Sequence, residues 1–208
     1  MLLYAIPPSL YCAKLRIVLR AKGLEWREER PPGGYGSEEY KRVVPSGNLP
    51  ALVEDGFLLA DGEAIAEYLE ERFPAPPLMP VDLRDRARMR ERSRFHDTRL
   101  EPAVRRLFPH IALAGRDDTV VARTVREIDV RLAQFARMVT DDLAFGLGDC
   151  GWPITLLWIE LLGPRMGFSV VLPAEVAAYR ERVEQVPWVA AELASYLPAV
   201  EAYLASER

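Results

Sequence analysis

Ser9 and Cys12 are the residues whose types and spacing most directly suggest chemistry. They lie three positions apart, just after Pro7 and Pro8 end an extended run and where a helix is predicted to begin. The spacing looks like that of a redox Cys-x-x-Cys motif in which oxygen replaces the first sulfur. Three interpretations follow: a disabled redox site, a site that activates the sulfur of another molecule, or a serine that only caps the helix.

The other side chains of metal-binding type are few and scattered. The chain has two cysteines, Cys12 and Cys150, and two histidines, His96 and His110, without the spacing of metal ligands. We therefore expect no metal site. Two cysteines also make no disulfide framework, so we expect a cytoplasmic protein.

Composition argues against two classes of partner. The net charge is −4 and the isoelectric point is about 5.4, which gives no overall attraction to nucleic acid. No stretch approaches about 18 uninterrupted apolar residues, so no membrane span is expected. Nine arginines lie between Arg84 and Arg106, but those at 84–94 alternate around the expected helix. That pattern favours a solvated face with salt bridges across a dimer.

Residues 1–80 mix strand and helix patterns. The runs MLLYAI and LEWREE predict strands, and the segment from Ser9 to Gly23 between them predicts a helix. SEEYKRVV could form one or two helical turns. PALVEDGFLLA, with Asp55-Gly56 at its centre, predicts a β-hairpin. A helix follows, and its expected apolar face consists of Ala64, Ile65, Tyr68 and Leu69.

A proline-rich stretch, PAPPLMP at residues 74–80, separates this half from the rest of the chain. Strand patterns are absent after it, which predicts a change of architecture. We expect a first domain at residues 1–74, a linker at 75–81 and an all-helical domain at 82–208.

Helical spacing of apolar residues marks the second half. It runs through residues 100–111 and 121–139, and residues 154–162 are apolar nearly all round, as in a helix at the centre of a bundle. Pro173 and Pro187 suit the first turns of two later helices.

This order of elements resembles the cytosolic glutathione transferase family over essentially the whole chain. Its most specific part is SGNLPALVEDGFLLADGEAIAEYLEERFP, which is similar to the family's cis-proline, β-hairpin and glutathione-carboxylate site. YRERVEQVPWVAAEL is similar to its late Arg-Val-x-x-x-Pro pattern. Ser9, with Lys14 and Arg16 downstream, looks most like serine-type classes such as theta, zeta and tau, or related bacterial dehalogenases and β-etherases. The resemblance implies a thioredoxin-like α/β N-terminal domain and an all-α C-terminal bundle.

The resemblance also implies glutathione as co-substrate and Ser9 as the catalytic residue, whose hydroxyl donates a hydrogen bond to the glutathione thiolate. Leu49-Pro50 matches the family's cis-proline, where the preceding backbone binds glutathione as an added strand would. Composition alone favours a trans proline that opens a strand. Asp61-Gly62 matches the acid–serine pair that holds the γ-glutamyl group, although Asp61 could merely cap a helix. The implied glutathione-binding residues are Asn48, Leu49, Pro50, Asp61 and Gly62.

The sequence departs from the family pattern in three places. Gly62 stands where the family has serine, so a hydroxyl that would bind the γ-glutamyl carboxylate is missing. Val44 stands where Asn-Pro is common. Cys150 and Pro153 lie where the family usually has a capping box, which concerns folding more than chemistry.

The remaining site residues are expected on weaker grounds. Cys12 matches the resolving cysteine of redox relatives, so it is a candidate accessory thiol, with packing behind the helix as the alternative. Asp97 is near where family members reach glutathione across the dimer. The expected electrophile pocket, between Ser9 and the helix after the linker, consists of Phe95, Arg99, Ala103 and Arg106.

The leading functional prediction is a cytoplasmic, homodimeric glutathione transferase that conjugates glutathione to a small hydrophobic electrophile in detoxification. It would need no metal and no nucleic-acid or membrane partner. One alternative is a non-catalytic binding or regulatory protein of the same fold, which Gly62 favours. The other is a glutathione-linked oxidoreductase that uses Cys12.

Overall fold

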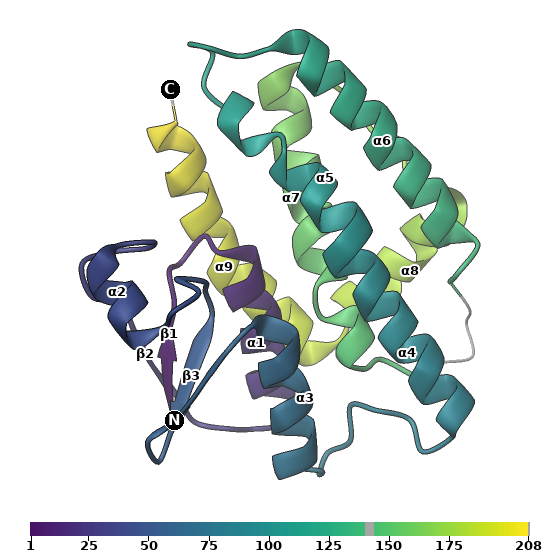
Figure 1. The fold of residues 1–208 in the computed structure, drawn as a ribbon. Helices are drawn as coiled ribbons and strands as arrows, with labels where there is room; N and C mark the ends of the chain where they lie inside the picture. The colour runs from purple at the N-terminus through teal and green to yellow at the C-terminus, as the bar shows by residue number, and fades with distance from the viewer. Residues whose placement is uncertain (140–143, 208) are drawn as a thin grey trace.

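A mixed sheet forms the first part of the molecule. The structure is a computed structural model that describes residues 1–139 and 144–207 (Figure 1). β1 is parallel to β2 and antiparallel to β3, which is antiparallel to β4, so the strand order is β2-β1-β3-β4. The strands are β1 (Leu2–Tyr4), β2 (Arg27–Glu29), β3 (Ala51–Glu54) and β4 (Phe57–Ala60).

The turn between β3 and β4 follows from the chemistry of its two residues. Asp55 and Gly56 have φ values of 49° and 83°. Two-residue hairpin turns that match the strand twist need positive φ at both positions, which aspartate and glycine tolerate. The turn sets a register in which Leu52 pairs with Leu59. The predicted β-hairpin is therefore confirmed.

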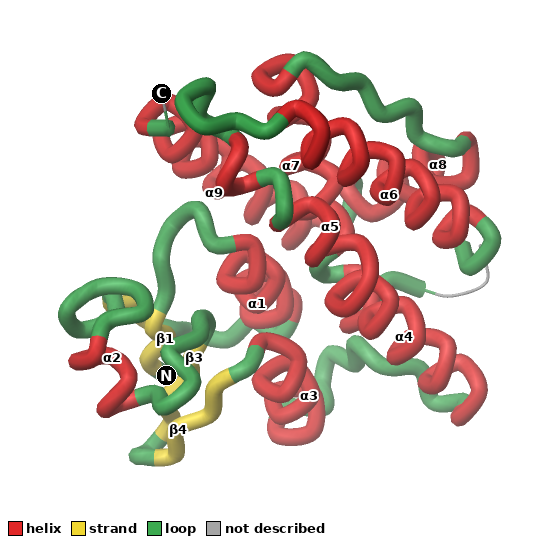
Figure 2. Tube along the Cα trace, turned by 45° about the horizontal axis from the view of Figure 1, so that its top comes forward, coloured by secondary structure: helices red, strands yellow, loops and turns green. Residues whose placement is uncertain are grey.

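Three helices accompany the sheet. α1 (Leu10–Ala21) and α3 (Gly62–Arg72) lie side by side on one face, and α2 (Glu38–Val43) lies on the other side of the strands (Figure 2). Their apolar faces share a core with the sheet, formed by Leu3, Leu15, Val18, Leu52, Ile65 and Leu69. The predicted face of α3 was partly wrong, because Ala64 is exposed and Ala66 is buried instead.

Helices form the rest of the described chain, so the predicted fold class, a thioredoxin-like domain followed by an all-helical bundle, is confirmed. α7 lies at the bundle centre with Trp152 and Trp158 fully buried. Pro173 precedes α8 and Pro187 opens α9, as predicted. The helices are α4 (Leu83–Phe95), α5 (Glu101–Arg105), α6 (Asp118–Ala136), α7 (Trp152–Met166), α8 (Ala174–Glu184) and α9 (Pro187–Ser206), with a π-helical turn at His96–Leu100 and 3-10 turns at Phe108–His110 and Leu147–Asp149.

The segment between α3 and α4 forms no helix or strand, and it contains the stretch expected to be a linker. The domain boundaries at residues 74 and 82 stay a prediction. None of the helices in the described ranges combines the length and the apolar character that a membrane crossing requires.

One arginine of α4 does not belong to a solvated face. Arg92 is 4% exposed, and its guanidinium lies 2.6 Å from Asp149 Oδ1, which also accepts a hydrogen bond from the Tyr179 hydroxyl. The expectation of a solvated face was right for the exposed Arg84 and Arg90 but wrong for Arg92. A buried guanidinium needs a carboxylate partner, and this one lies far along the chain.

A capping contact lies just before α7, where Asp149 Oδ2 accepts a hydrogen bond from the Gly146 N–H at 2.9 Å, and among the described residues α7 itself starts without a side-chain cap. Gly151 precedes the helix, Pro153 lies in its first turn, and none of the described side chains caps its N–H groups. A Cβ at position 151 would overlap the His96 ring. Glycine therefore lets α7 pack directly against the π-helical turn.

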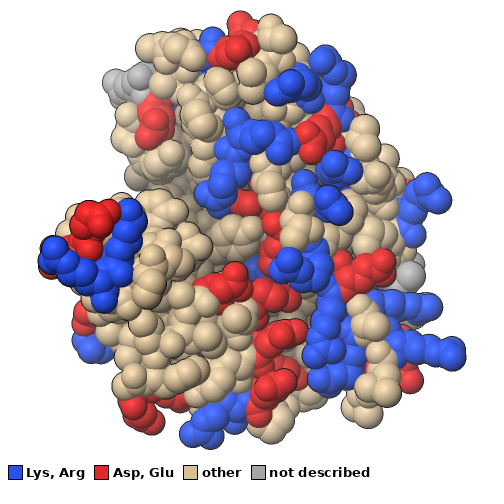
Figure 3. All heavy atoms as spheres, viewed as in Figure 1, with Lys and Arg blue, Asp and Glu red and all other residues tan. Residues whose placement is uncertain are grey.

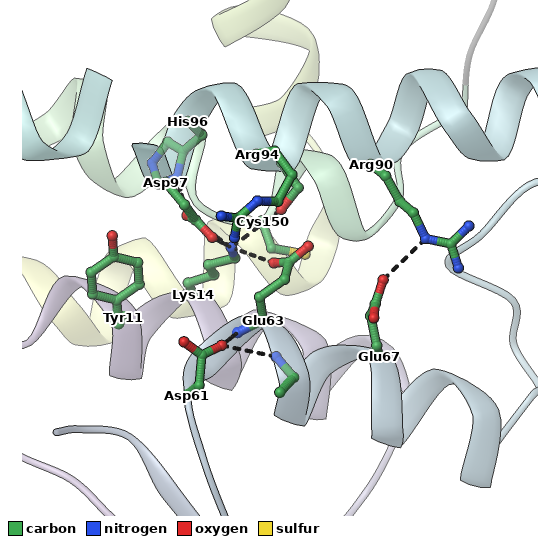
Figure 4. A network of polar contacts seen from close by, with 12 residues as sticks. Tyr11, Lys14, Asp61, Glu63, Glu67, Arg90, Arg94, His96, Asp97 and Cys150 are labelled. Carbon is green, nitrogen blue, oxygen red and sulfur yellow. Dashed lines mark hydrogen bonds and ion pairs between the residues drawn. The ribbon is translucent and has the colours of Figure 1, made fainter. Parts of the chain in front are cut away.

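A buried lysine joins the two halves of the molecule (Figure 4). Lys14 of α1 is 1% exposed, and its ammonium donates to Glu63 Oε2 of α3 (2.7 Å) and to Asp97 Oδ2 of the π-helical turn (2.8 Å). His96 Nδ1 donates to Asp97 Oδ1 (2.7 Å), and its Nε2 lies 2.7 Å from Thr155 Oγ1 of α7. The charge of Lys14 is thus matched by one carboxylate from each half.

The network holds its charges in spite of burial. Burial alone would lower the pKa of Lys14, but the negative charges of Asp97 and Glu63 raise it overall. Burial alone would raise the pKa of Asp97, but the hydrogen bond from His96 and the charge of Lys14 hold it well below its usual range. Both groups therefore stay ionised in the folded protein at neutral pH.

We predict that Lys14→Met lowers the free energy of unfolding by about 3 kcal/mol, because it leaves the largely desolvated Glu63 and Asp97 carboxylates, 14% and 10% exposed, without their shared cation. Arg90→Met is the matched control. Arg90 pairs with Glu67 at 3.0 Å across the same two helices, but both side chains are more than 40% exposed, so its loss should cost less than about 1 kcal/mol. Urea unfolding measures both, and equal losses would contradict the prediction.

Asp97→Asn should weaken the dependence of the unfolding free energy on pH in the acid range. A carboxyl group whose pKa is lower in the folded than in the unfolded protein stabilises the fold above its unfolded pKa of about 3.9, and that contribution is lost as the pH falls further. The difference in unfolding free energy between the natural protein and Asp97→Asn should thus shrink between about pH 5 and pH 2. A constant difference over that range would disprove a role for the Asp97 charge.

Candidate functional site

A cleft of about 660 Å³ lies between the two halves of the molecule. Figure 3 shows it as a hollow with acidic side chains on one rim and basic side chains on the other. The first half contributes Ile6, Pro8, Ser9, Leu10, Tyr11, Tyr35, Asn48, Leu49, Asp61, Gly62 and Glu63. The helical half contributes Arg94, Asp97, Thr98, Arg105, Phe108, Trp158 and Tyr203.

Ser9 lies in this cleft at the N-terminus of α1. Its backbone is extended (φ −71°, ψ 121°), and its hydroxyl accepts a hydrogen bond from the Cys12 N–H at 3.3 Å. Ser9 is therefore a helix cap, and it also faces the cleft. A hydroxyl accepts and donates at once, so capping leaves its hydrogen for a ligand. The N-terminus of α1 adds a partial positive charge that favours an anion there.

Cys12 does not belong to the cleft. Its side chain is fully buried, and burial raises the pKa of its thiol. A buried thiol with a raised pKa is a poor nucleophile. The burial of Cys12 therefore favours packing behind the helix over a role as accessory thiol. Cys150 is buried in the same way, with no disulfide to Cys12.

The segment before β3 presents backbone to the cleft. The Leu49–Pro50 peptide bond is cis, as the resemblance implied. Asn48 and Leu49 line the cleft, and the hydroxyl of buried Tyr40 donates to the Asn48 carbonyl at 2.9 Å. Pro50 is buried behind them, and so is Val44, whose departure from the family pattern fills space in the core.

Asp61 and Gly62 both line the cleft at the start of α3. Asp61 caps the helix, since its Oδ1 accepts hydrogen bonds from the N–H groups of Glu63 and Ala64, both at 3.0 Å. Its backbone is left-handed (φ 91°), which the sequence did not reveal. The cap engages one carboxylate oxygen and leaves the other for a ligand.

The backbone conformation at position 62 does not require glycine. Its φ lies outside the left-handed region, and a Cβ there would lie 3.6 Å from Pro50 Cδ and 3.8 Å from Tyr11 Cδ1. These are ordinary van der Waals distances, so the position would accept a side chain. Neither backbone strain nor lack of space therefore explains why position 62 has no hydroxyl.

The residues predicted to line the electrophile pocket lie mostly one position after the residues that line the cleft. Phe95 stacks on Trp152, and Ala103 is fully buried in the bundle. Arg99 is exposed, and Arg106 pairs with Glu127. None of these four predicted residues lines the cleft. One residue turns a helix by about 100°. The apolar residues of this face belong to the bundle core, and the residues of these helices that line the cleft are Arg94, Asp97, Thr98, Arg105 and Phe108.

The sequence analysis missed the five aromatic residues of the cleft, which are Tyr11, Tyr35, Phe108, Trp158 and Tyr203. Tyr11 lies two residues after Ser9, within the segment predicted to form a helix. Its hydroxyl donates to Glu101 Oε2 at 3.0 Å. Burial and the charge of Glu101 hold the pKa of Tyr11 well above its usual range, so it stays a donor. Trp158 and Tyr203 reach the cleft from distant helices, which no local signal indicates.

Asp97 belongs to the network around Lys14, and its expected contact with glutathione across a dimer stays a prediction. It lines the cleft, but its two oxygens are engaged by Lys14 and His96 of the same chain. Glu63 is likewise engaged by Lys14. The described residues contain no group of three or more His, Cys, Asp and Glu side chains that could hold a metal ion.

Comparisons with known proteins agree with this arrangement. A family model described as glutathione S-transferase, N-terminal domain, matches residues 3–77. The stringent starvation protein A homolog of Pasteurella multocida (strain Pm70) is 32% identical over 192 residues, which cover 88% of this chain and 85% of that protein. Glutathione S-transferase Z1 of Arabidopsis thaliana is 38% identical over 89 residues, which cover 41% of this chain and 40% of that protein.

The similarity extends to solved structures. A glutathione S-transferase of Methylobacterium radiotolerans, crystallised with glutathione sulfonate, superposes with a TM-score of 0.69 and 27% identity over 92% of this chain and 93% of that one. The fold, the family match and a relative similar over most of its length lead to one conclusion. The chain belongs to the cytosolic glutathione transferase family.

Proposed function

We propose that the protein is a glutathione transferase that binds glutathione in the cleft and joins its sulfur to a small hydrophobic electrophile. One observation carries the proposal. A single cleft holds the Ser9 hydroxyl at a helix N-terminus, the backbone of Leu49 beside a cis-proline, and the start of α3 at Asp61 and Gly62. The glutathione sulfonate in the Methylobacterium radiotolerans relative supports glutathione as the ligand.

In the proposed reaction Ser9 donates a hydrogen bond to the thiolate, the sulfur forms a bond to the electrophilic carbon, and the leaving group departs with the electron pair. A hydrogen bond to a charge is worth roughly 1.5–3 kcal/mol, which lowers a thiol pKa by about 1–2 units. A thiol of pKa about 8.5 is roughly 3% ionised at pH 7, and one of pKa about 6.5 is roughly 75% ionised.

The greater ionisation of the thiol alone would increase the rate only modestly. Nucleophilicity falls with pKa, with a slope of about 0.4–0.5 in thiol–disulfide exchange, so a 25-fold gain in thiolate becomes roughly threefold if the same slope applies. The larger contribution must come from holding the electrophile next to the sulfur. The aromatic wall of Phe108 and Tyr203 in the same cleft suits that task.

The second candidate is a non-catalytic binding or regulatory protein. Two observations favour it: Gly62 lacks the hydroxyl that the family uses, and a relative similar over most of the chain is named for stringent starvation rather than for a reaction. The oxidoreductase alternative loses its support, because it depends on the buried Cys12. The homodimer, the cytoplasmic location and the role in detoxification stay predictions.

We predict that Ser9→Ala raises the pKa of the bound glutathione thiol by about 1–2 units and lowers conjugation with 1-chloro-2,4-dinitrobenzene. Ser9→Thr should keep both properties. The thiolate absorbance in the ultraviolet, followed against pH, measures the thiol pKa directly.

Ser37→Ala is the matched control, because Ser37 caps α2 through the Tyr40 N–H at 3.0 Å and lies outside the cleft. Both alanine variants lose a helix cap and about 1 kcal/mol of stability, but only Ser9→Ala should change the thiol pKa. An unchanged thiol pKa in Ser9→Ala would reject the role of Ser9.

Gly62→Ser should bind glutathione about tenfold more tightly than the natural protein, because it adds a hydroxyl that can reach the γ-glutamyl carboxylate. A backbone N–H or a water molecule recovers part of that interaction in the natural protein, so the gain is at the low end for a bond to a charge. Titration calorimetry measures it. Ala64→Ser is the control, since Ala64 lies on the same helix, exposed and outside the cleft.

The result separates the two candidate functions. A folded Gly62→Ser that binds no more tightly than the natural protein would mean that position 62 does not mark a missing contact. If neither protein binds glutathione at millimolar concentration, the transferase proposal falls and the binding or regulatory protein takes its place.

A further inference from the structure

The helical half of the cleft has an aromatic wall whose rings are inclined to one another, with interplanar angles of 41° between Phe108 and Trp158 and 77° between Trp158 and Tyr203. The rings of Phe108 and Trp158 lie 4.7 Å apart between centroids, and those of Trp158 and Tyr203 lie 6.0 Å apart. Trp158 is fully buried and its indole N–H donates to the Tyr196 hydroxyl at 2.8 Å, so it supports the partly exposed Phe108 and Tyr203 from behind. Inclined rings held in this way can contact an aromatic ligand through ring faces and ring edges.

Arg105 is a fixed cation next to this wall. Its guanidinium carbon lies 5.4 Å from the Phe108 ring centroid and 5.6 Å from that of Tyr11. Its Nε donates to Glu101 Oε1 at 2.6 Å and its Nη2 forms an ion pair with the same oxygen, while the Tyr11 hydroxyl donates to the other Glu101 oxygen. The Arg105 side chain is 47% exposed. A guanidinium has five N–H donors, so donors remain for a ligand after Glu101 is satisfied.

Arg94 adds a second positive charge to the cleft. It is exposed and forms no ion pair with any other residue of the described ranges. The acids nearby have cations of their own, since Glu63 and Asp97 share Lys14 and Glu101 pairs with Arg105. Asp61 keeps a free oxygen at the expected γ-glutamyl end of the cleft. Among the described residues of the helical wall, Arg94 therefore has all its donors available for a ligand.

We propose that the cleft selects flat electrophiles that carry a carboxylate, which Arg94 and Arg105 bind while Phe108 and Tyr203 contact the ring. This inference rests on the proposed transferase function and names its substrate class. Guanidinium groups present paired donors that match the two oxygens of a carboxylate. A neutral electrophile of the same shape would keep the ring contacts and lose these bonds.

The test compares 4-chloro-3-nitrobenzoate with 4-chloro-3-nitrobenzamide, which have nearly the same shape and differ in charge. In both, the glutathione sulfur forms a bond to the ring carbon that bears chlorine, the carbon–chlorine bond breaks, and chloride leaves with the electron pair. The thiol proton passes to buffer. Dividing kcat/KM by the rate constant of the uncatalysed reaction removes the difference in intrinsic reactivity.

We expect the natural protein to prefer the benzoate by about tenfold, the low end for a hydrogen bond to a charge, because the arginines are partly exposed. Arg94→Gln and Arg105→Gln should each reduce the preference, and the double variant should abolish it. Arg105→Lys, which keeps the charge without the paired donors, should retain part of it. Arg99→Gln is the control, because Arg99 is exposed on the same stretch of helix outside the cleft.

A binding measurement separates this inference from the proposed function. Calorimetry with 4-methyl-3-nitrobenzoate and its amide, which have no leaving group, should show the same preference and the same loss in the arginine variants. If neither chloro compound is converted but this binding preference holds, the transferase proposal fails and the carboxylate site stands. If the natural protein shows no preference in either measurement, the inference is overturned.

A second result would also overturn it. The two arginines could bind a carboxylate of glutathione itself. The arginine variants would then bind glutathione more weakly while keeping the natural ratio of benzoate to benzamide turnover.

Discussion

The buried ammonium of Lys14 is the constraint on which the arrangement of the two halves depends. An ammonium with no access to water must meet carboxylates within hydrogen-bond distance, and these come from Glu63 of α3 and Asp97 of the π-helical turn. The two halves can therefore approach each other in only a narrow range of positions. The cleft borders this joint, since Glu63 and Asp97 line it, so the same contact fixes the distance between its walls.

The joint also sets the electrostatic character of the cleft. Two carboxylates would repel the thiolate of a bound glutathione, but Lys14 and His96 engage them. The N-terminus of α1 then acts on the thiolate without a nearby unpaired acid on the same wall, because Asp61 lies at the other end of the expected ligand. A contact that looks structural thus protects the chemistry expected of Ser9.

The sequence predicted those features whose causes lie within a few residues. Asp55-Gly56 marked the hairpin, and the caps at Ser9 and Asp61 marked two helix starts, because turns and caps depend on local backbone chemistry. The buried pair Arg92–Asp149 was missed, because its partners lie 57 residues apart. The cleft face of the helix after the linker was misplaced by one residue, because packing against Trp152 decided which side of that helix is buried.

The fold alone does not decide between an enzyme and a binding protein, since one scaffold can serve both. The choice depends on how firmly glutathione is held, and position 62 contributes directly to that. Gly62 has an ordinary backbone conformation and space for a side chain, so neither strain nor packing accounts for the glycine. Under the proposed function, a site that lacks one bond to the γ-glutamyl group would place more weight on its other contacts, the Leu49 backbone and Asp61, and on the wall that would hold the second substrate. The helical half of the cleft would then be where the specificity is concentrated.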